Sequence, residues 1–495
     1  MKSEESEDTS APSSPVLLSV KKAINELQRD GIFEIPLNFI PWEDSLVPID
    51  HSTIGTIFLE LGRNADSIAN DTEFILTSAV TLFVLFIYTN HEREILSIVT
   101  AGWSDKLLPT PVESNDPDPL SLHISGWTPK ARDAFEARQW LFLPPRFRTL
   151  GEHVDLQDRC ILPFVQCHVL KDINNEKAIY NVKIHRQYQT IYHPNSEPEP
   201  SIAIKRFSSN ASTNFWHERK VLCQLSHLKE EHISPILASY THRGEYFIMS
   251  PLAVSDLAEY WMQKDPIRDM EEYVRWFIRE ITGVMGAFCK MHNMSNPQNP
   301  TSTSKPEGIF HGDIKPGNIL VMEDKRLVLN DFGLSAWTND PSSFETTRTY
   351  EAPESQLNKP VGPSSDIWSF GCVIFEGLIW LLHGYDAVQN FSQQRIMATE
   401  GLGLPFKDDH FFMLRYEDRK PVGAKIRETV EKYSEGIREH ERCVGAVKEL
   451  LDIVMENMLV VNHNERGIAS DIVSKYQGIL DRQDEKYSCK DGRNT

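Results

Sequence analysis

One short stretch of the chain, His-Gly-Asp-Ile-Lys-Pro-Gly-Asn at 311–318, places an acid, a lysine and an amide at fixed offsets. A second acid, Asp331, follows it and precedes a Phe-Gly pair. A carboxylate such as Asp313 can orient a hydroxyl nucleophile and accept its proton, and an ammonium such as Lys315 can neutralise charge on a moving phosphoryl group. The side-chain oxygens of Asn318 and Asp331 are ligands that Mg²⁺ accepts. The ordered set therefore indicates phosphoryl transfer, with Asp313 and Lys315 catalytic and Asn318 and Asp331 binding the metal.

Further segments surround this stretch in a recognisable order. Ala-Ile-Lys at 203–205 precedes it, and Asp-Phe-Gly at 331–333 and Ala-Pro-Glu at 352–354 follow it. Asp-Ile-Trp-Ser-Phe-Gly comes next, at 366–371. This order and spacing resemble the eukaryotic protein kinase family over roughly residues 158–482.

The resemblance implies an α+β, two-lobed protein-kinase-like domain. Its small lobe, residues 158–252, would be an antiparallel sheet with one helix, and its large lobe, residues 253–482, would be mainly α-helical. We expect an α-helical N-terminal module over residues 16–157, an acidic tail without fixed structure over 1–15 and a polar tail over 483–495. The implied activity is transfer of the γ-phosphoryl group of ATP, with Mg²⁺, to serine or threonine hydroxyls of protein substrates.

Lys205 lies within an apolar strand predicted over residues 202–207. A lysine in such a strand is costly unless it is paired with an acid. The resemblance identifies that acid as Glu218, on a helix predicted over residues 214–225, where Leu222 shares the same face. We therefore expect Lys205 to contact the phosphates of ATP and Glu218 to position Lys205.

The resemblance also implies a set of nucleotide contacts. Met249 would lie behind the adenine, and the backbone of Ser250 to Leu252 would offer the base donors and acceptors. Asp256 would meet the ribose or, equally, Ser255 or Asp256 would cap the helix that follows. With Ala203 and Lys205 on the strand, the predicted nucleotide-binding residues are Ala203, Lys205, Met249, Ser250, Leu252 and Asp256.

A small-molecule phosphotransferase of the aminoglycoside or choline kinase type is the nearest rival. That group also combines a His-Gly-Asp with an Asn five residues after the Asp. Two features favour a protein kinase: Lys315, which matches serine/threonine kinases rather than tyrosine kinases, and the 352–354 and 366–371 segments, which build a shelf for a peptide. A late arginine, Arg466, is the expected ion-pair partner of Glu354 on that shelf.

The chain departs from the family at the glycine-rich phosphate loop. No glycine occurs between Glu152 and Arg243, and the loop position carries Asp172, Asn174, Asn175 and Glu176. Glycine lets backbone N–H groups approach phosphates, whereas the two acids would repel them. Asn tolerates the positive φ of a turn. An inactive pseudokinase that serves as a scaffold or signalling module is therefore the alternative function.

Gly312 stands where many regulated kinases carry an arginine that pairs with a phosphorylated activation loop. The chain is in that sense a non-RD kinase, and phosphorylation of Ser342, Ser343 or Thr346 should have little effect. Thr347 occupies the family's place for a threonine that bridges Asp313 and Lys315.

The composition limits the remaining possibilities. The chain has 51 basic and 71 acidic side chains, a formal charge of −20, which argues against nucleic acid or an anionic membrane as the main partner. Its seven cysteines show no metal or disulfide spacing, and the acidic N-terminus lacks the features of a signal peptide. The longest apolar run, residues 74–88, would span about 22 Å as a helix, short of a bilayer core. We expect a buried helix there, no membrane span, and a cytoplasmic or nuclear protein.

The first 157 residues show helical patterns without catalytic motifs. Val20, Ile24 and Leu27 share one helical face, and further apolar faces occur over 93–101 and 131–142. Trp-Leu-Phe-Leu at 140–143 and Leu-Pro-Phe at 162–164 are similar to a pattern in fungal kinase-domain proteins with a helical N-terminal region.

Overall fold

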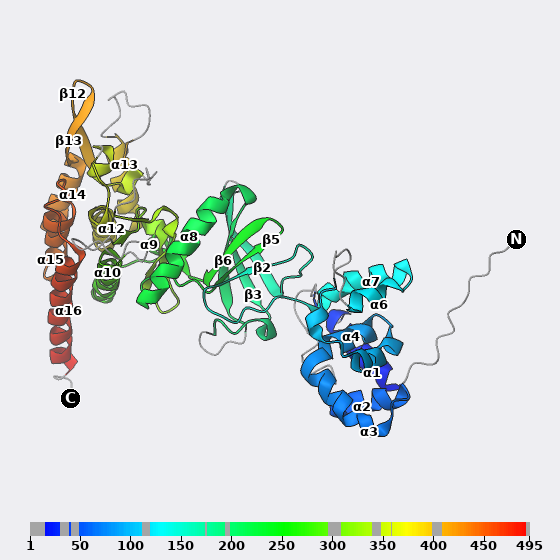
Figure 1. Cartoon of the computed structure of the whole chain (residues 1–495). Coiled ribbons are helices and arrows are strands. Elements are labelled where there is room, and N and C mark those ends of the chain that lie inside the picture. Colours follow the sequence, from blue (N-terminus) through cyan, green and yellow to red (C-terminus); the bar gives the residue numbers. More distant parts are fainter. Residues whose placement is uncertain are drawn as a thin grey trace. The chain divides into compact units, whose positions relative to one another are not determined.

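The computed structural model describes residues 15–29, 39–40, 49–110, 119–173, 176–193, 199–295, 308–338, 348–357, 359–397 and 408–491. The chain forms two compact units. The first comprises residues 1–208 and 237–249, and the second comprises residues 209–236 and 250–495. Both helices and strands are present, so the predicted α+β class is confirmed (Figure 1).

Helices make up the N-terminal part of the first unit, as the sequence patterns predict. Val20 and Ile24 are fully buried on one face of the first helix, and Leu27 lies outside the residues whose side chains are described. The helices are α1 (Pro15–Arg29), α2 (His51–Glu60), α3 (Ala65–Phe74), α4 (Val80–Tyr88), α5 (Ile95–Ala101), α6 (Pro119–Ser125) and α7 (Pro129–Gln139).

The predicted apolar run forms a π-helical turn, Ile75–Ala79, that leads directly into α4. Leu82 to Ile87 are all fully buried in the core of these helices, which confirms the expected buried helix. Two helical stretches, Ala65–Tyr88 and Pro363–His383, are long and apolar enough to cross a membrane by length and composition. Half of the apolar window of the first and 94% of that of the second are buried inside the protein, as in core helices.

A six-stranded sheet forms the rest of the first unit, in the order β1-β5-β6-β4-β3-β2. The strands are β1 (Glu152–Asp155), β2 (Phe164–Ile173), β3 (Lys177–Ile184), β4 (Ser201–Phe207), β5 (Ala238–His242) and β6 (Glu245–Pro251). The β2–β3, β3–β4 and β5–β6 pairs are antiparallel, as predicted. β1 differs: it lies in the range predicted for the helical module, yet it pairs with β5 in parallel.

The β2–β3 hairpin occupies the place of the family's phosphate loop. Its register pairs Ile173 with Lys177, and β2 shifts register near Val169. The turn residues Asn174 and Asn175 lie outside the described residues. The acids on both sides of the turn are exposed, which agrees with their charge.

The second unit is mainly helical. Its helix α12 is buried from Ser365 to Leu382, because most of this stretch is apolar and its two acids, Asp366 and Glu376, have buried partners. Helix α16 packs along α10 (Figure 1). The helices are α8 (Ser212–Leu225), α9 (Leu257–Gln263), α10 (Met270–His292), α11 (Pro353–Gln356), α12 (Pro363–His383), α13 (Tyr385–Met397), α14 (Glu428–Glu439), α15 (Ala446–Ile453) and α16 (Ala469–Asp491).

Three small sheets complete the second unit. The first has the order β10-β9-β7, the second pairs β8 with β11, and the third pairs β12 with β13. Their strands are β7 (Ser255–Asp256), β8 (Ile309–Phe310), β9 (Ile319–Val321), β10 (Leu327–Leu329), β11 (Ala336–Trp337), β12 (Phe412–Glu417) and β13 (Lys420–Ile426).

Two elements depart from the predicted arrangement. The helix that carries Glu218, α8, was expected in the small lobe, but it belongs to the helical second unit, where it packs on the turn Phe332–Leu334. The chain after residue 482 was expected to be a tail, yet α16 continues to Asp491. Beyond residue 482, Asp484 forms an exposed ion pair with Arg275 of α10 at 2.7 Å.

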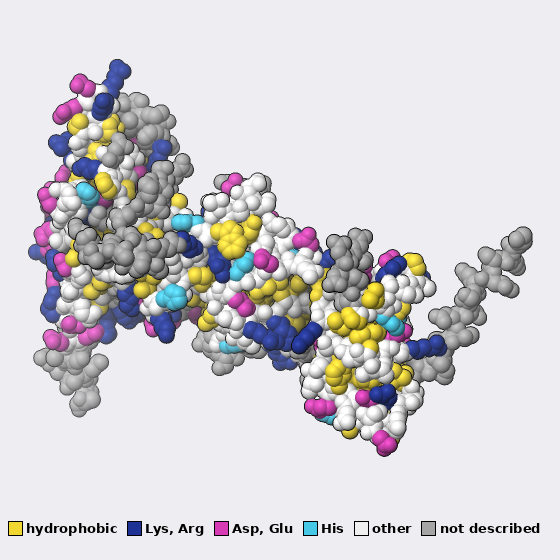
Figure 2. Space-filling model, in the orientation of Figure 1, with side chains coloured by type: hydrophobic (Ala, Val, Ile, Leu, Met, Phe, Trp, Pro, Cys, Tyr) yellow, Lys and Arg dark blue, Asp and Glu magenta, His cyan; other side chains and the backbone are white. Residues whose placement is uncertain are grey.

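Charged side chains are mixed on the surface. In Figure 2, acidic and basic groups alternate over the visible face of the second unit rather than gathering by sign. The cysteines of the described residues, from Cys160 to Cys443, are free thiols. On this face, the described residues of the second unit form no single acidic patch (Figure 2).

Candidate active site

The loop that carries Asp313 is fixed at both ends by short antiparallel pairs. β8 leads into it and pairs with β11, and β9 leaves it and pairs with β10. A loop held by strands on both sides has little freedom to change shape. This arrangement suits a group that must meet a reacting atom within a fraction of an ångström.

Three of the predicted site residues come together in this loop. The Lys315 ammonium lies 2.7 Å from Asp313 Oδ2. The Asn318 amide nitrogen donates to Asp313 twice, to the backbone carbonyl oxygen at 2.8 Å and to Oδ2 at 2.9 Å. Asp313 and Asn318 are buried, whereas the Lys315 side chain is 29% exposed. The carboxylate is thus fixed by two donors from its own loop.

The β9–β10 register brings the two predicted metal ligands to one end of that hairpin. The Asn330 N–H donates to the Asn318 carbonyl oxygen at 2.9 Å, and Asp331 is the next residue. Because the Asn318 amide nitrogen points at Asp313, its Oδ1 atom is the oxygen left to coordinate a cation. The described residues contain no cluster of three His, Cys, Asp or Glu side chains that could hold a metal. A magnesium ion here would need phosphate oxygens as further ligands, which is how Mg²⁺ is usually bound.

Asp366, near the start of α12, anchors the loop from below. It is 1% exposed and accepts the His311 N–H at 2.8 Å and the Gly312 N–H at 3.0 Å. His292 Nε2 lies 2.9 Å from the same carboxylate. The buried helix α12 therefore fixes the backbone of the two residues that precede Asp313.

Gly312 has a structural role that the sequence pattern alone did not suggest. Its φ is +80°, and a Cβ atom there would lie 2.8 Å from the Leu334 carbonyl oxygen. L-residues with a side chain are strained in this left-handed region, and the contact would be sterically forbidden. At the position where many regulated kinases carry an arginine, the loop of this chain therefore has a shape that requires glycine.

Glu218 and Asp331 approach the same point beside Gly333. Oxygens of both carboxylates lie 3.4 Å from the position that a Gly333 Cβ would occupy. Glu218 is buried, and Asp331 has a φ of +64°. The preceding residue on α8, His217, places Nε2 2.8 Å from the Ser335 carbonyl oxygen and so holds the helix to this segment.

Lys205 and two of the other predicted nucleotide contacts, Ala203 and Met249, lie in the sheet of the first unit. The Lys205 ammonium stands over the Phe207 ring, 5.2 Å from its centroid. Ala203 faces Asn181 on the neighbouring strand, and Met249 is fully buried in the core of the sheet. Because Lys205 and Glu218 belong to different units, their pairing stays a prediction, as do the nucleotide contacts of Ala203 and Met249.

The end of β6 carries the remaining predicted contacts to the base. Ser250 and Leu252 are partly buried there, and their contacts to the base also stay predictions. Asp256 caps α9 by accepting the Glu259 N–H at 2.9 Å. The N-cap role expected as one of two alternatives is therefore confirmed, and contact with the ribose stays a prediction.

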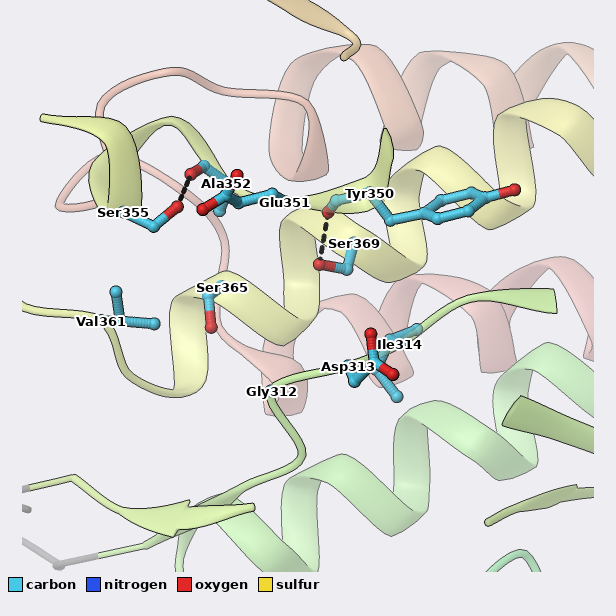
Figure 3. Close-up of a pocket in the computed structure, with 10 residues that line it drawn as sticks. All are labelled: Gly312, Asp313, Ile314, Tyr350, Glu351, Ala352, Ser355, Val361, Ser365 and Ser369. Carbon is cyan, nitrogen blue, oxygen red and sulfur yellow. Dashed lines mark hydrogen bonds between the residues drawn. The ribbon is translucent and has the colours of Figure 1, made fainter. Parts of the chain in front are cut away.

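An open cleft lies directly beside Asp313 (Figure 3). Ser369 Oγ on α12 donates to the Tyr350 carbonyl oxygen at 2.7 Å and so fixes one wall of the cleft. The lining residues come from the Asp313 loop, from the segment around Glu351 and from the chain at the start of α12: Gly312, Asp313, Ile314, Tyr350, Glu351, Ala352, Ser355, Val361, Ser365 and Ser369.

The predicted ion pair of Glu354 and Arg466 is confirmed. The two side chains meet through two hydrogen bonds of 2.7 and 2.9 Å, and both are buried. The Arg466 guanidinium also stands over the Trp368 ring, 5.2 Å from its centroid. This pair connects the 352–354 segment to the start of α12. Thr347 and the predicted phosphorylation sites Ser342, Ser343 and Thr346 lie outside the described residues.

Comparison with known proteins agrees with this geometry. A family model described as protein kinase domain matches residues 195–476. The mitogen-activated protein kinase HOG1 of Wallemia muriae is 30% identical over 256 residues, which cover 50% of this chain and 81% of that protein. HOG1 of Cryphonectria parasitica is 28% identical over 55% of this chain and 70% of its own length. Mouse cyclin-dependent kinase-like 5 is 24% identical over 58% of this chain and 29% of its own length.

Proposed function

Because the chain belongs to the protein kinase family, with the family model matching residues 195–476, we propose that it is an active serine/threonine kinase. It would transfer the γ-phosphoryl group of ATP to hydroxyls of protein substrates. The single observation that carries the proposal is the arrangement of Asp313, Lys315 and Asn318 in one fixed loop. A chain that had lost catalysis would have no need to hold an acid, a cation and an amide in mutual contact.

Each residue of the loop has a definite task in this proposal. Asp313 orients the substrate hydroxyl and accepts its proton at Oδ1 or Oδ2 as that oxygen bonds to the γ-phosphorus and the bond between the γ-phosphorus and the oxygen of the leaving ADP breaks. Lys315, 2.7 Å from Asp313 in the structure, balances the charge of the carboxylate and of the transferred group. Because the cleft begins at Asp313, a peptide hydroxyl can reach the carboxylate from the solvent side.

Asn318 and Asp331 are the residues that would hold Mg²⁺ beside the nucleotide phosphates. Both offer hard oxygen atoms, and the hairpin register keeps them at one end of β9 and β10. The ion would neutralise phosphate charge when bound. Lys205 would add a second positive charge there, and Glu218 would position Lys205, as the family resemblance implies. Ala203, Met249, Ser250, Leu252 and Asp256 would contact the adenosine.

The β2–β3 hairpin supports the alternative of a pseudokinase. Asp172 and Glu176 flank its turn and are exposed, and no glycine allows the backbone to approach phosphates. A scaffold that no longer binds ATP would tolerate these acids. The loop around Asp313 favours the active kinase, because a scaffold does not need its geometry.

Thermal unfolding with and without nucleotide separates the two functions. Millimolar ATP with Mg²⁺ should raise the melting temperature of the wild-type chain, since a ligand that binds only the folded state stabilises it. Mg²⁺ alone should not, and Lys205→Met should reduce the shift. No shift in the wild-type chain would support the scaffold and contradict the kinase proposal.

A further inference from the structure

Two residues that line the cleft, Tyr350 and Glu351, form hydrogen bonds with side chains that do not line it. In Figure 3, Tyr350 turns its ring away from Glu351 and Ser355, and its hydroxyl donates to Glu376 Oε2 at 2.9 Å. Glu351 Oε2 lies 3.2 Å from His410 Nε2. His410 belongs to the charged stretch between α13 and α14, which carries no motif.

His410 lies between two carboxylates. Its Nε2 faces Glu351, and its Nδ1 contacts the carboxylate of Asp408. A neutral imidazole has one N–H, so only the positively charged ring can donate to both acceptors at once. Glu351 is also held by the Gln356 amide, which donates to the same oxygen at 2.8 Å.

A fully buried arginine holds the other side of His410. Arg427 Nε donates to the His410 carbonyl oxygen at 2.6 Å, and its Nη2 lies 3.0 Å from Asp408 Oδ1. Its Nη1 donates to the Arg395 carbonyl oxygen at 3.1 Å. Charges removed from water need such complete partnering, because an unpaired one is very costly. The arrangement of Arg427, Asp408 and His410 is therefore a specific structural feature of the fold.

A second buried arginine closes the network toward Tyr350. Arg395 is fully buried, lies 3.1 Å from Glu376 and stands over the rings of Phe391 and Phe411, 4.1 and 4.4 Å from their centroids. Its Nε donates to the Asp409 carbonyl oxygen at 3.0 Å. The carboxylate of Asp409 in turn accepts the Thr349 hydroxyl at 2.7 Å. Three successive residues, 349–351, are thus tied to one internal ion network.

We propose that His410 is a positioning residue for the substrate cleft, holding Glu351 and the 349–352 wall against the 408–427 segment. The proposal rests on the proposed kinase function for its consequence on catalysis. His410 does not touch the reacting atoms. It fixes the 349–352 wall, which faces Asp313. Replacement of His410 should therefore weaken binding of the protein substrate and leave the ATP site unaffected.

The charges around His410 agree with this role. Burial of the ring acts to lower the pKa of His410, but the hydrogen bonds with Asp408 and Glu351 outweigh burial and raise it. Burial acts to raise the pKa of Glu351, yet its bonds with His410 and Gln356 keep that pKa low. Arg427 faces the same cluster from α14's start, and Arg395 and Glu376 lie beyond it. The wall should therefore be fixed at neutral pH and loosen as the pH rises through the raised pKa of His410.

Steady-state kinetics of His410→Gln tests the proposal. The KM for a protein substrate should rise at least about fivefold, while the KM for ATP stays unchanged. In the wild-type chain, kcat/KM for the protein substrate should fall as the pH rises through the pKa of His410, and this fall should vanish in the variant. His227→Gln, which changes an exposed histidine of the same unit, should behave like the wild-type chain.

Amide hydrogen exchange gives a readout that needs no turnover. Exchange over residues 348–357 should accelerate in His410→Gln and in Glu351→Gln, whereas exchange over 313–321 should not change. If the wild-type chain transfers no phosphate, the kinase proposal fails, and this measurement still decides the role of His410. The proposal would be overturned if both variants exchanged over 348–357 at the wild-type rate, or if His410→Gln left the KM for the protein substrate unchanged.

Discussion

The side-chain amide of Asn318 donates to two oxygens of Asp313, the backbone carbonyl at 2.8 Å and Oδ2 at 2.9 Å. One residue thereby fixes the backbone and the carboxylate of its neighbour in the loop. The same donation sets the direction of its own carbonyl oxygen. Positioning of the acid and binding of the metal are therefore coupled through a single side chain.

Substitution of Asn318 should reveal this coupling. Asn318→Ala removes both the donor and the oxygen ligand, so kcat should fall by about 10- to 100-fold and more Mg²⁺ should be needed for half-maximal activity. Asn318→Asp restores an oxygen ligand but not the donors, so its Mg²⁺ requirement should recover more than its kcat. The measurement is turnover against Mg²⁺ concentration, with the exposed Asn464→Ala as control. Full recovery of kcat in Asn318→Asp would show that the donors do not matter.

Removal of Arg466 should strongly destabilise the second unit. Arg466→Ala leaves Glu354 buried and without its partner, which typically costs about 3–5 kcal/mol. Arg482→Ala breaks the exposed pair with Glu449 and should cost less than about 1 kcal/mol. Urea unfolding of the three proteins compares these changes. Similar midpoints for the two variants would contradict the structural role of the buried pair.

The Asp313 loop could be predicted because its residue types stand at short, fixed offsets, and the family resemblance implied the Glu354–Arg466 pair across 112 positions. The parallel pairing of β1 with β5 could not be predicted, since no local pattern in Glu152–Asp155 specifies a partner 86 residues away. The continuation of α16 accompanies its packing along α10, which lies far away in the sequence. The same holds for His410: its partners come from three separate segments, and a lone histidine in a charged stretch carries no signal.

The backbone at Gly312 should not accept a side chain. Gly312→Ala forces a Cβ into the left-handed region and toward the Leu334 carbonyl oxygen, so the unfolding free energy should fall by about 1–2 kcal/mol or more. Gly317→Ala, in the same loop, meets no atom closer than 4.0 Å and should be neutral or slightly stabilising. Denaturant unfolding of both variants measures the difference. A neutral Gly312→Ala would show that the loop has another shape.

Asp408 should contribute stability that depends on pH. Burial acts to raise its pKa, but hydrogen bonds from His410 and the charge of Arg427 lower it to about 2, below the ordinary value of 3.8. A carboxylate with a lowered folded pKa stabilises the fold above its unfolded pKa and loses that contribution as the pH falls toward its folded pKa. Asp408→Asn should therefore be less stable than the wild-type chain at pH 7, and the difference should shrink between about pH 4 and pH 2. A difference independent of pH, as expected for a purely steric effect, would contradict this role.

Phosphate transfer by the wild-type chain and by Asp313→Asn tests the central claim most directly. The substitution preserves size and removes the proton acceptor, so incorporation of phosphate into a basic protein substrate should fall by at least about 100-fold. The Mg²⁺–ATP thermal shift should persist in the variant, which would show that the fold and the nucleotide site are intact. Equal incorporation by the two proteins, with the thermal shift retained, would contradict the assignment of Asp313 and the kinase activity built on it.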